Sequence, residues 1–187
     1  MVFQISMLHH EVFEYLMKRK SQDQDFFFRP RIVDRDNRLA KGYWFLGDDN
    51  YLSVSFWSAG EASNKTPNIC IEITNKRETR VILSAKDSEG TIPFLQETAN
   101  KCTGYRKINK SAWQKNYQGI DYLAHLESFL NEDKPIIDSL IESMDPPGVG
   151  FLDDAFHEQY VGRIIDQRAK RRQSFNSKAP VVRKISK

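Results

Sequence analysis

Apolar residues follow a helical period at the start of the chain and a strand period after it. Within residues 4–19 they recur at helical spacing, which predicts an amphipathic helix with one buried face. From Asp25 the pattern changes to short runs of aromatic and β-branched residues, typical of strands. These runs are 26–33, 42–46, 51–57, 68–74 and 79–84. Short polar turns link several of them, so we expect an antiparallel meander of four to five strands.

The helical period returns after Ser88. Three helices are predicted, ending near Lys101, over 120–130 and from an N-cap at Asp133 to Met144. The predicted fold class is therefore α+β, an antiparallel sheet with an N-terminal helix and several C-terminal helices packed on it. The expected organisation is a globular domain over 1–145, a Pro/Gly linker over 146–150, an amphipathic helix with a basic end over 151–172 and a basic, flexible tail over 173–187.

Charge is unevenly distributed along the chain. Residues 163–187 hold nine Lys or Arg against one acid, Asp166, a net charge of +8. Because the whole chain carries +3, residues 1–162 carry −5. A short basic segment attracts a polyanion such as nucleic acid. The sequence therefore predicts nucleic acid as the partner.

Candidate binding residues are basic side chains near the end of the chain and aromatic side chains on the sheet. Tyr51 and Trp57 alternate onto the non-core face of one strand, and Tyr43 is a possible neighbour. Exposed aromatics on a sheet stack bases at roughly 1 to 3 kcal/mol each. The alternative is that helices cover this face. The predicted phosphate contacts are Arg168, Lys170, Arg171, Arg172, Arg183 and Lys184.

Two other classes of function compete with this prediction. In a metal-dependent nuclease, Asp48, Asp49, Glu72, Lys86 and Asp87 would converge on a cation. The Glu-x-Lys strand signature is missing, however, and the adjacent aspartates suit a turn. In a protein-interaction module, the 151–165 helix would dock on a partner subunit. Phe156, Tyr160 and Ile164 would form its apolar face.

Several chemistries lack support in the sequence. The nine glycines form no phosphate loop, and Cys70 and Cys102 are too few for a zinc cage, so we expect no cofactor and two buried, reduced thiols. His9 and His10 lie about 100° apart on the predicted helix and cannot hold one metal, so we expect them at the surface or half-buried. No apolar run approaches a membrane span of about 18 residues. We expect a cytoplasmic protein.

One stretch resembles a known family. The sequence over 42–57, GYWFLGDDNYLSVSFW, followed by 66–69 and 84–88, resembles the N-terminal region that precedes the motor domain in McrB-like restriction ATPases. Trp113, Lys115 and Tyr117 also fit this resemblance. It implies target recognition, often of DNA, without chemistry of its own. We therefore expect a non-enzymatic nucleic-acid-binding module, with DNA favoured, in a restriction or phage-defence system.

Overall fold

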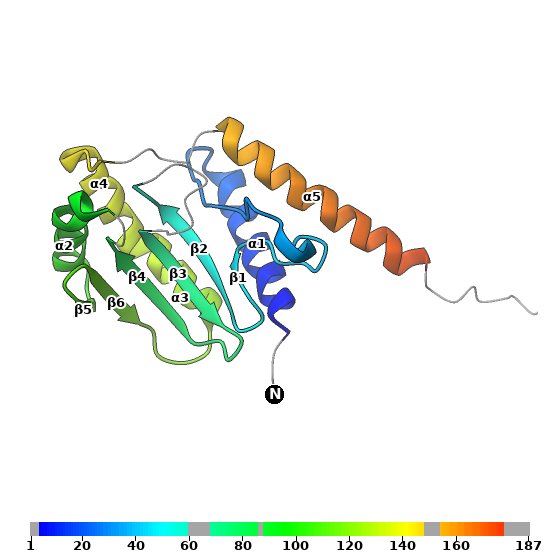
Figure 1. The fold of residues 1–187 in the computed structure, drawn as a ribbon, viewed down its shortest axis with the longest axis horizontal. Helices are drawn as coiled ribbons and strands as arrows, with labels where there is room; N and C mark the ends of the chain where they lie inside the picture. The colour runs from blue at the N-terminus through cyan, green and yellow to red at the C-terminus, as the bar shows by residue number, and fades with distance from the viewer. Residues whose placement is uncertain (1–3, 60–67, 86–87, 148–153, 178–187) are drawn as a thin grey trace, which may run out of the picture.

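A six-stranded antiparallel sheet forms the centre of the molecule (Figure 1). The computed structural model describes residues 4–59, 68–85, 88–147 and 154–177. The strands, in spatial order, are β1 (Leu46–Gly47), β2 (Tyr51–Trp57), β3 (Ile69–Thr74), β4 (Thr79–Ser84), β6 (Ala112–Asn116) and β5 (Arg106–Asn109). The α+β class is confirmed. Within the described residues, no helix is long and apolar enough to cross a membrane.

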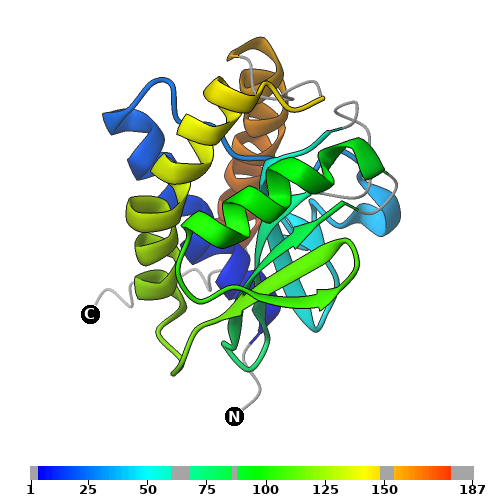
Figure 2. The same cartoon turned by 90° about the vertical axis from the view of Figure 1, so that its left-hand side faces the viewer.

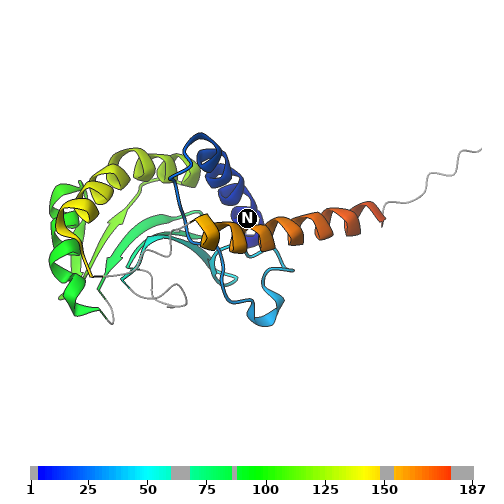
Figure 3. The same cartoon turned by 90° about the horizontal axis from the view of Figure 1, so that it is seen from above.

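The helices gather mainly on one face of the sheet and at its ends (Figures 2 and 3). Leu52, Val54 and Phe56 of β2 point into the resulting core, where the ring centroid of Phe56 lies 5.2 Å from that of Phe129. The helices are α1 (Ile5–Gln22), α2 (Ile92–Lys101), α3 (Tyr122–Ser128), α4 (Lys134–Met144) and α5 (Asp154–Ser177). Short 3₁₀ turns lie at Arg35–Asn37 and Glu89–Thr91.

The sheet differs from the predicted meander at both edges. The predicted strand over 26–33 is extended but forms no ladder: Arg29 makes an isolated bridge with Ser55, and the Arg31 N–H donates to the Trp44 carbonyl at 2.8 Å. Pro30 between them has no N–H to continue a ladder. The predicted strand over 42–46 reaches the sheet only at its last residue. At the other edge, β5 and β6 form a hairpin that the sequence reading missed. All four β5 residues are exposed, so no apolar alternation marks that strand.

Asp133 occupies the predicted N-cap position of α4, but its side chain makes no capping hydrogen bond. Residues Phe129–Asp133 form a π-helical segment that joins α3 to α4 in one continuous helix. Asp133 is buried there, 2% exposed, and its carboxylate accepts hydrogen bonds from Lys115 Nζ at 3.0 and 3.1 Å and from Tyr105 Oη at 3.0 Å. This contact between a helix and β6 fixes the residue in the interior. The two cysteines are buried and unpaired, as predicted.

Candidate nucleic-acid interface

Helix α5 carries the basic residues and contacts the rest of the molecule from His157 to Arg171 (Figures 1 and 3). Val161 and Ile164 are buried in the main core, and Arg163 Nη1 donates to the Ile32 carbonyl at 2.9 Å. The prediction that Ile164 faces a partner subunit is therefore wrong, because this side chain packs within its own chain. The helix also continues to Ser177, beyond the predicted end at 172, since no Pro or Gly follows Gly162 before Pro180.

Two arginines of α5 attach its second half to the body. Arg168 forms an ion pair with Glu14 of α1, and its guanidinium carbon lies 5.1 Å from the ring centroid of Phe13. Arg171 Nη1 donates to the Ala40 carbonyl at 3.0 Å. Lys170 and Arg172 are exposed. Part of the positive charge expected on an independent extension is thus held at fixed positions beside the acidic body.

These arginines line a small cavity between the two ends of the described chain. Its volume is about 160 Å³. We call it the arginine pocket, and its walls are Ser6 and His10 of α1, Gly42 and Trp44 from the segment before β1, and Arg168, Arg171 and Arg172 of α5. The pocket brings together three of the predicted phosphate-binding residues, because positions 168, 171 and 172 share one face of a helix.

Gly42 and Trp44 form a wall of the pocket that lies close to the α5 arginines. Gly42 has a φ of +90°, and a Cβ placed there would lie 2.6 Å from Arg171 Nη1. Glycine therefore allows both the backbone turn and the close approach of the guanidinium. Trp44 is only 3% exposed, and its indole Nε1 has no hydrogen-bond partner among the residues described. The guanidinium carbon of Arg171 lies 6.0 Å from the centroid of the Trp44 ring, so this ring and Gly42 together form the surface on which Arg171 rests.

Positive charge dominates the pocket. Burial lowers the pKa of His10, and the nearby charges of Arg168, Arg172 and Arg171 lower it further. Burial and the neighbouring Arg172 likewise lower the pKa of Arg168. Like charges held this close disfavour one another's charged forms. An anion bound among them would relieve that repulsion, so the pocket is suited to a negatively charged group.

The predicted base-stacking aromatics are not at this pocket. Trp57 is 5% exposed and packs edge-on against Phe94 of α2 at 4.8 Å, so its prediction as a stacking surface is wrong. A β-bulge between Ser55 and Trp57 shifts the alternation of β2 and places Trp57 opposite Ile69, on the core side. Tyr51 keeps the predicted face and is half-buried. Burial raises its pKa.

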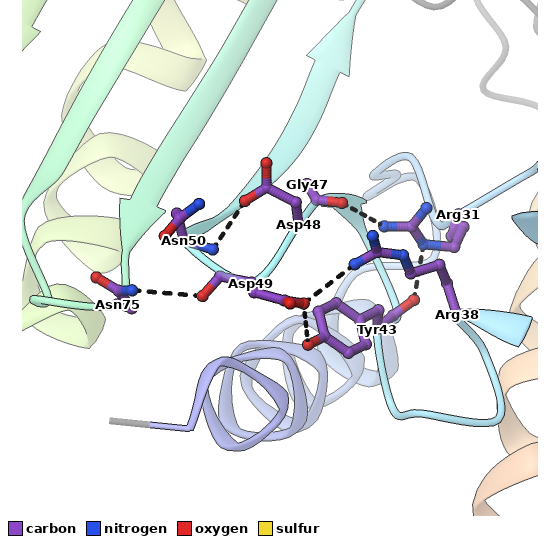
Figure 4. Close-up of polar contacts among 8 residues, drawn as sticks. All are labelled: Arg31, Arg38, Tyr43, Gly47, Asp48, Asp49, Asn50 and Asn75. Atoms are coloured by element: carbon purple, nitrogen blue, oxygen red, sulfur yellow. Dashed lines mark hydrogen bonds and ion pairs between the residues drawn. The ribbon is translucent and has the colours of Figure 1, made fainter. Parts of the chain in front are cut away.

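Tyr43 belongs to a polar network around the β1–β2 turn (Figure 4). Its hydroxyl donates to Asp49 Oδ1 at 2.7 Å, and its ring centroid lies 5.2 Å from that of His9 and 5.1 Å from the guanidinium carbon of Arg38. Burial and the hydrogen bond to Asp49 raise the pKa of Tyr43 to about 12. Tyr43 thus supports the turn, and the neighbouring Trp44 is the aromatic residue that reaches the pocket.

The same network explains the two aspartates considered for a metal site. Asp48 Oδ1 accepts the Asn50 N–H at 2.7 Å, a local turn contact (Figure 4). Asp49 binds Tyr43 and, at 3.2 Å, Arg38 Nη1. Their interpretation as turn residues is confirmed. Arg31 stabilises the turn by donating hydrogen bonds to the Tyr43 and Gly47 carbonyls.

The remaining nuclease candidates do not assemble into a site. Glu72 is nearly buried and forms an ion pair with Arg80 on the adjacent strand. Lys86 and Asp87 lie outside the described residues. Among the residues that the structure does describe, no three or more His, Cys, Asp or Glu gather as a metal would require. His9 also departs from expectation, because it is fully buried and its Nδ1 accepts the Phe45 N–H at 3.2 Å.

Sequence reasoning missed the part of the pocket that comes from outside α5. Ser6, His10, Gly42 and Trp44 carry no motif that links them to one another or to a residue more than 120 positions away. The spacing of the arginines in α5 was the available sequence signal for the pocket, and it identified only the wall that this helix forms. Arg183 and Lys184 lie outside the described residues.

Comparisons with protein-family models, curated proteins and solved structures give no match.

Proposed function

We propose that this chain is a non-enzymatic nucleic-acid-binding module that contacts phosphates through α5 and the arginine pocket. The observation that carries the proposal is the convergence of Arg168, Arg171 and Arg172 around one small cavity. Most protein–DNA hydrogen bonds go to phosphate and sugar oxygens, and arginine is well suited to binding them.

The two kinds of basic residue on α5 would have different tasks. Arg168 and Arg171 contact the body, so their guanidinium groups are held in place before a ligand arrives. Lys170 is exposed outside the pocket and would add attraction along the backbone of a nucleic acid, while Arg172 is exposed at the pocket wall and would serve both tasks. DNA is proposed over RNA, and a restriction or phage-defence setting is proposed, on the resemblance to McrB-like N-terminal regions alone.

The salt dependence of binding tests the proposal. A fluorescently labelled DNA duplex is titrated with the full chain at several salt concentrations, and the slope of log K against log salt is measured. Each phosphate contact contributes about −0.9 to that slope. The double variant Lys170→Gln/Arg172→Gln should therefore reduce its magnitude by up to about 1.8.

A matched control removes two positive charges at the opposite edge of the sheet. Arg106 and Lys110 are exposed on and beside β5, the edge strand opposite β1, whereas the arginine pocket includes Gly42 and Trp44 from the segment that leads into β1. Arg106→Gln/Lys110→Gln changes net charge equally and should leave the slope unchanged. Equal effects of the two double variants would show nonspecific attraction, and absence of duplex and single-strand binding at low salt would refute the proposal.

A protein-interaction module is the second candidate. Phe156 and Tyr160 of α5 are half-buried with ring centroids 4.6 Å apart, and Ile165 is 49% exposed. An apolar helix contact responds little to salt. Salt-insensitive self-association or partner binding that is lost in Ile165→Asp, without any nucleic-acid binding, would favour this candidate.

A further inference from the structure

We propose that the arginine pocket recognises one phosphate monoester, the group found at the 5′-phosphorylated end of a nucleic-acid strand. This inference rests on the proposed function and deepens it, because it assigns the pocket to a terminal phosphate and leaves the internal phosphates to exposed residues such as Lys170.

The size of the pocket favours a single small anion. At about 160 Å³ it is below the roughly 300 Å³ from which pockets for drug-sized ligands begin. The indole of Trp44 is buried in the wall, so its faces are not offered for base stacking. One phosphoryl group fits such a space, with the rest of the strand outside it.

The charge of the pocket favours a monoester over a diester. Three guanidinium groups line it; that of Arg168 forms an ion pair with Glu14, and that of Arg171 donates to the Ala40 carbonyl. A phosphate monoester carries about −1.5 to −2 charges at neutral pH, whereas each internal phosphate of a strand carries one. The terminal group therefore gains more from the same arginines, and their planar donor pairs match its oxygens.

The remaining donors of the pocket point to the same ligand. The Trp44 ring forms part of the wall and lies 6.0 Å from the guanidinium carbon of Arg171, so it helps to hold this donor at the pocket. Ser6 lies in the first turn of α1, an 18-residue helix whose first turn contains no acid and whose N-cap, Gln4, makes no side-chain capping bond. The positive end of this helix dipole adds to the attraction for an anion.

Paired oligonucleotides test the inference on the full chain. Single strands of one sequence, with a 5′-phosphate or a 5′-hydroxyl end, are compared by fluorescence anisotropy. We expect the phosphorylated strand to bind at least about tenfold more tightly than the hydroxyl strand. This is the difference that the loss of one charge-assisted hydrogen bond would cause. Arg172→Gln should shrink this ratio. Lys170→Gln, an equal charge change outside the pocket wall, should weaken both strands alike and preserve the ratio.

A second measurement reads the pocket directly. The three tryptophan indole N–H groups give separate resonances in a ¹⁵N-labelled sample, and Trp44 is assigned by its loss in Trp44→Phe. Titration with inorganic phosphate or a nucleoside 5′-monophosphate should shift the Trp44 resonance. The resonances of Trp57 and Trp113 should stay unchanged, because both side chains are buried elsewhere in the core.

The outcomes separate the inference from the proposed function. Equal affinity for the two strands together with an unmoved Trp44 resonance overturns the inference, even where nucleic-acid binding itself persists. Failure of both strands to bind, with a Trp44 shift caused by the monophosphate, refutes the proposed function but supports monoester recognition and assigns it to a small molecule. Preference for the phosphorylated strand with a Trp44 shift supports both.

Discussion

Two buried histidines should make this protein sensitive to mild acid. His9 is fully buried, and His157 is 3% exposed among Phe27 and Phe28. Burial, then the charges of Arg31 and Arg38, lowers the pKa of His9 to about 3. Burial, then Lys20, lowers the pKa of His157 to about 4. Both histidines are therefore neutral in the folded protein at pH 5.

The sign and size of the effect follow from linkage. An unfolded histidine, with a pKa near 6.5, gains a proton as the pH falls below that value, and the folded protein does not. Stability is therefore present above about pH 6.5 and is lost as the pH falls toward the folded pKa values. Between pH 7 and pH 5 each histidine removes about 2 kcal/mol of unfolding free energy.

Thermal unfolding of one variant isolates this effect from the carboxylates. His157→Phe places an aromatic ring beside the same phenylalanines without a titrating group, so the fall in Tm between pH 7 and pH 5 should shrink by about 4 to 8 °C. Phe27→Leu is the matched control, because it alters packing beside His157 and should lower Tm equally at both pH values. An unchanged pH dependence in His157→Phe would refute the reasoning.

Two stability predictions concern single contacts. Gly47→Ala should lower the free energy of unfolding by about 1 to 3 kcal/mol, measured by chemical denaturation. The φ of Gly47 is +122°, and the new Cβ would lie 2.1 Å from the Tyr51 carbonyl oxygen. As a control, Gly162→Ala, at an unobstructed position in α5, should raise stability slightly. Lys115→Met should lower the free energy of unfolding by about 3 to 5 kcal/mol, because it leaves the Asp133 carboxylate buried without its cation. The double variant Lys115→Met/Asp133→Leu should recover part of that loss. Additive effects of the two substitutions would contradict this prediction.

Local patterns predicted the central elements well. The periods over 51–57 and 79–84 match β2 and β4 residue for residue, and the helix ending at Lys101 was placed correctly. β4 alternates buried and half-buried residues, and β2 is buried after its first residue, so the burial of both strands is reflected in their apolar residues. The exposed strand β5 has no such pattern, which is why its hairpin with β6 went unnoticed.

Other features depend on contacts that a local pattern does not contain. The bulge in β2 moved Trp57 to the core, and alternation counted from Tyr51 assigned it to the wrong face. Asp133 looked like a helix cap because it precedes Pro135, and only its pairing with Lys115 explains its burial. For the site, the basic face of α5 was readable, but its partner surface on α1 was not.

The way α5 is attached implies that the pocket is less robust than the fold. Its second half is joined to the body by the ion pair between Arg168 and Glu14, 154 positions apart, and by the hydrogen bond from Arg171 to Ala40, whereas Val161 and Ile164 of its first half are buried in the main core. Opening of that second half alone would dismantle the anion site and leave the core contacts of α5 in place. A bound phosphate would shift that local equilibrium toward closure, so occupancy and helix docking are thermodynamically linked.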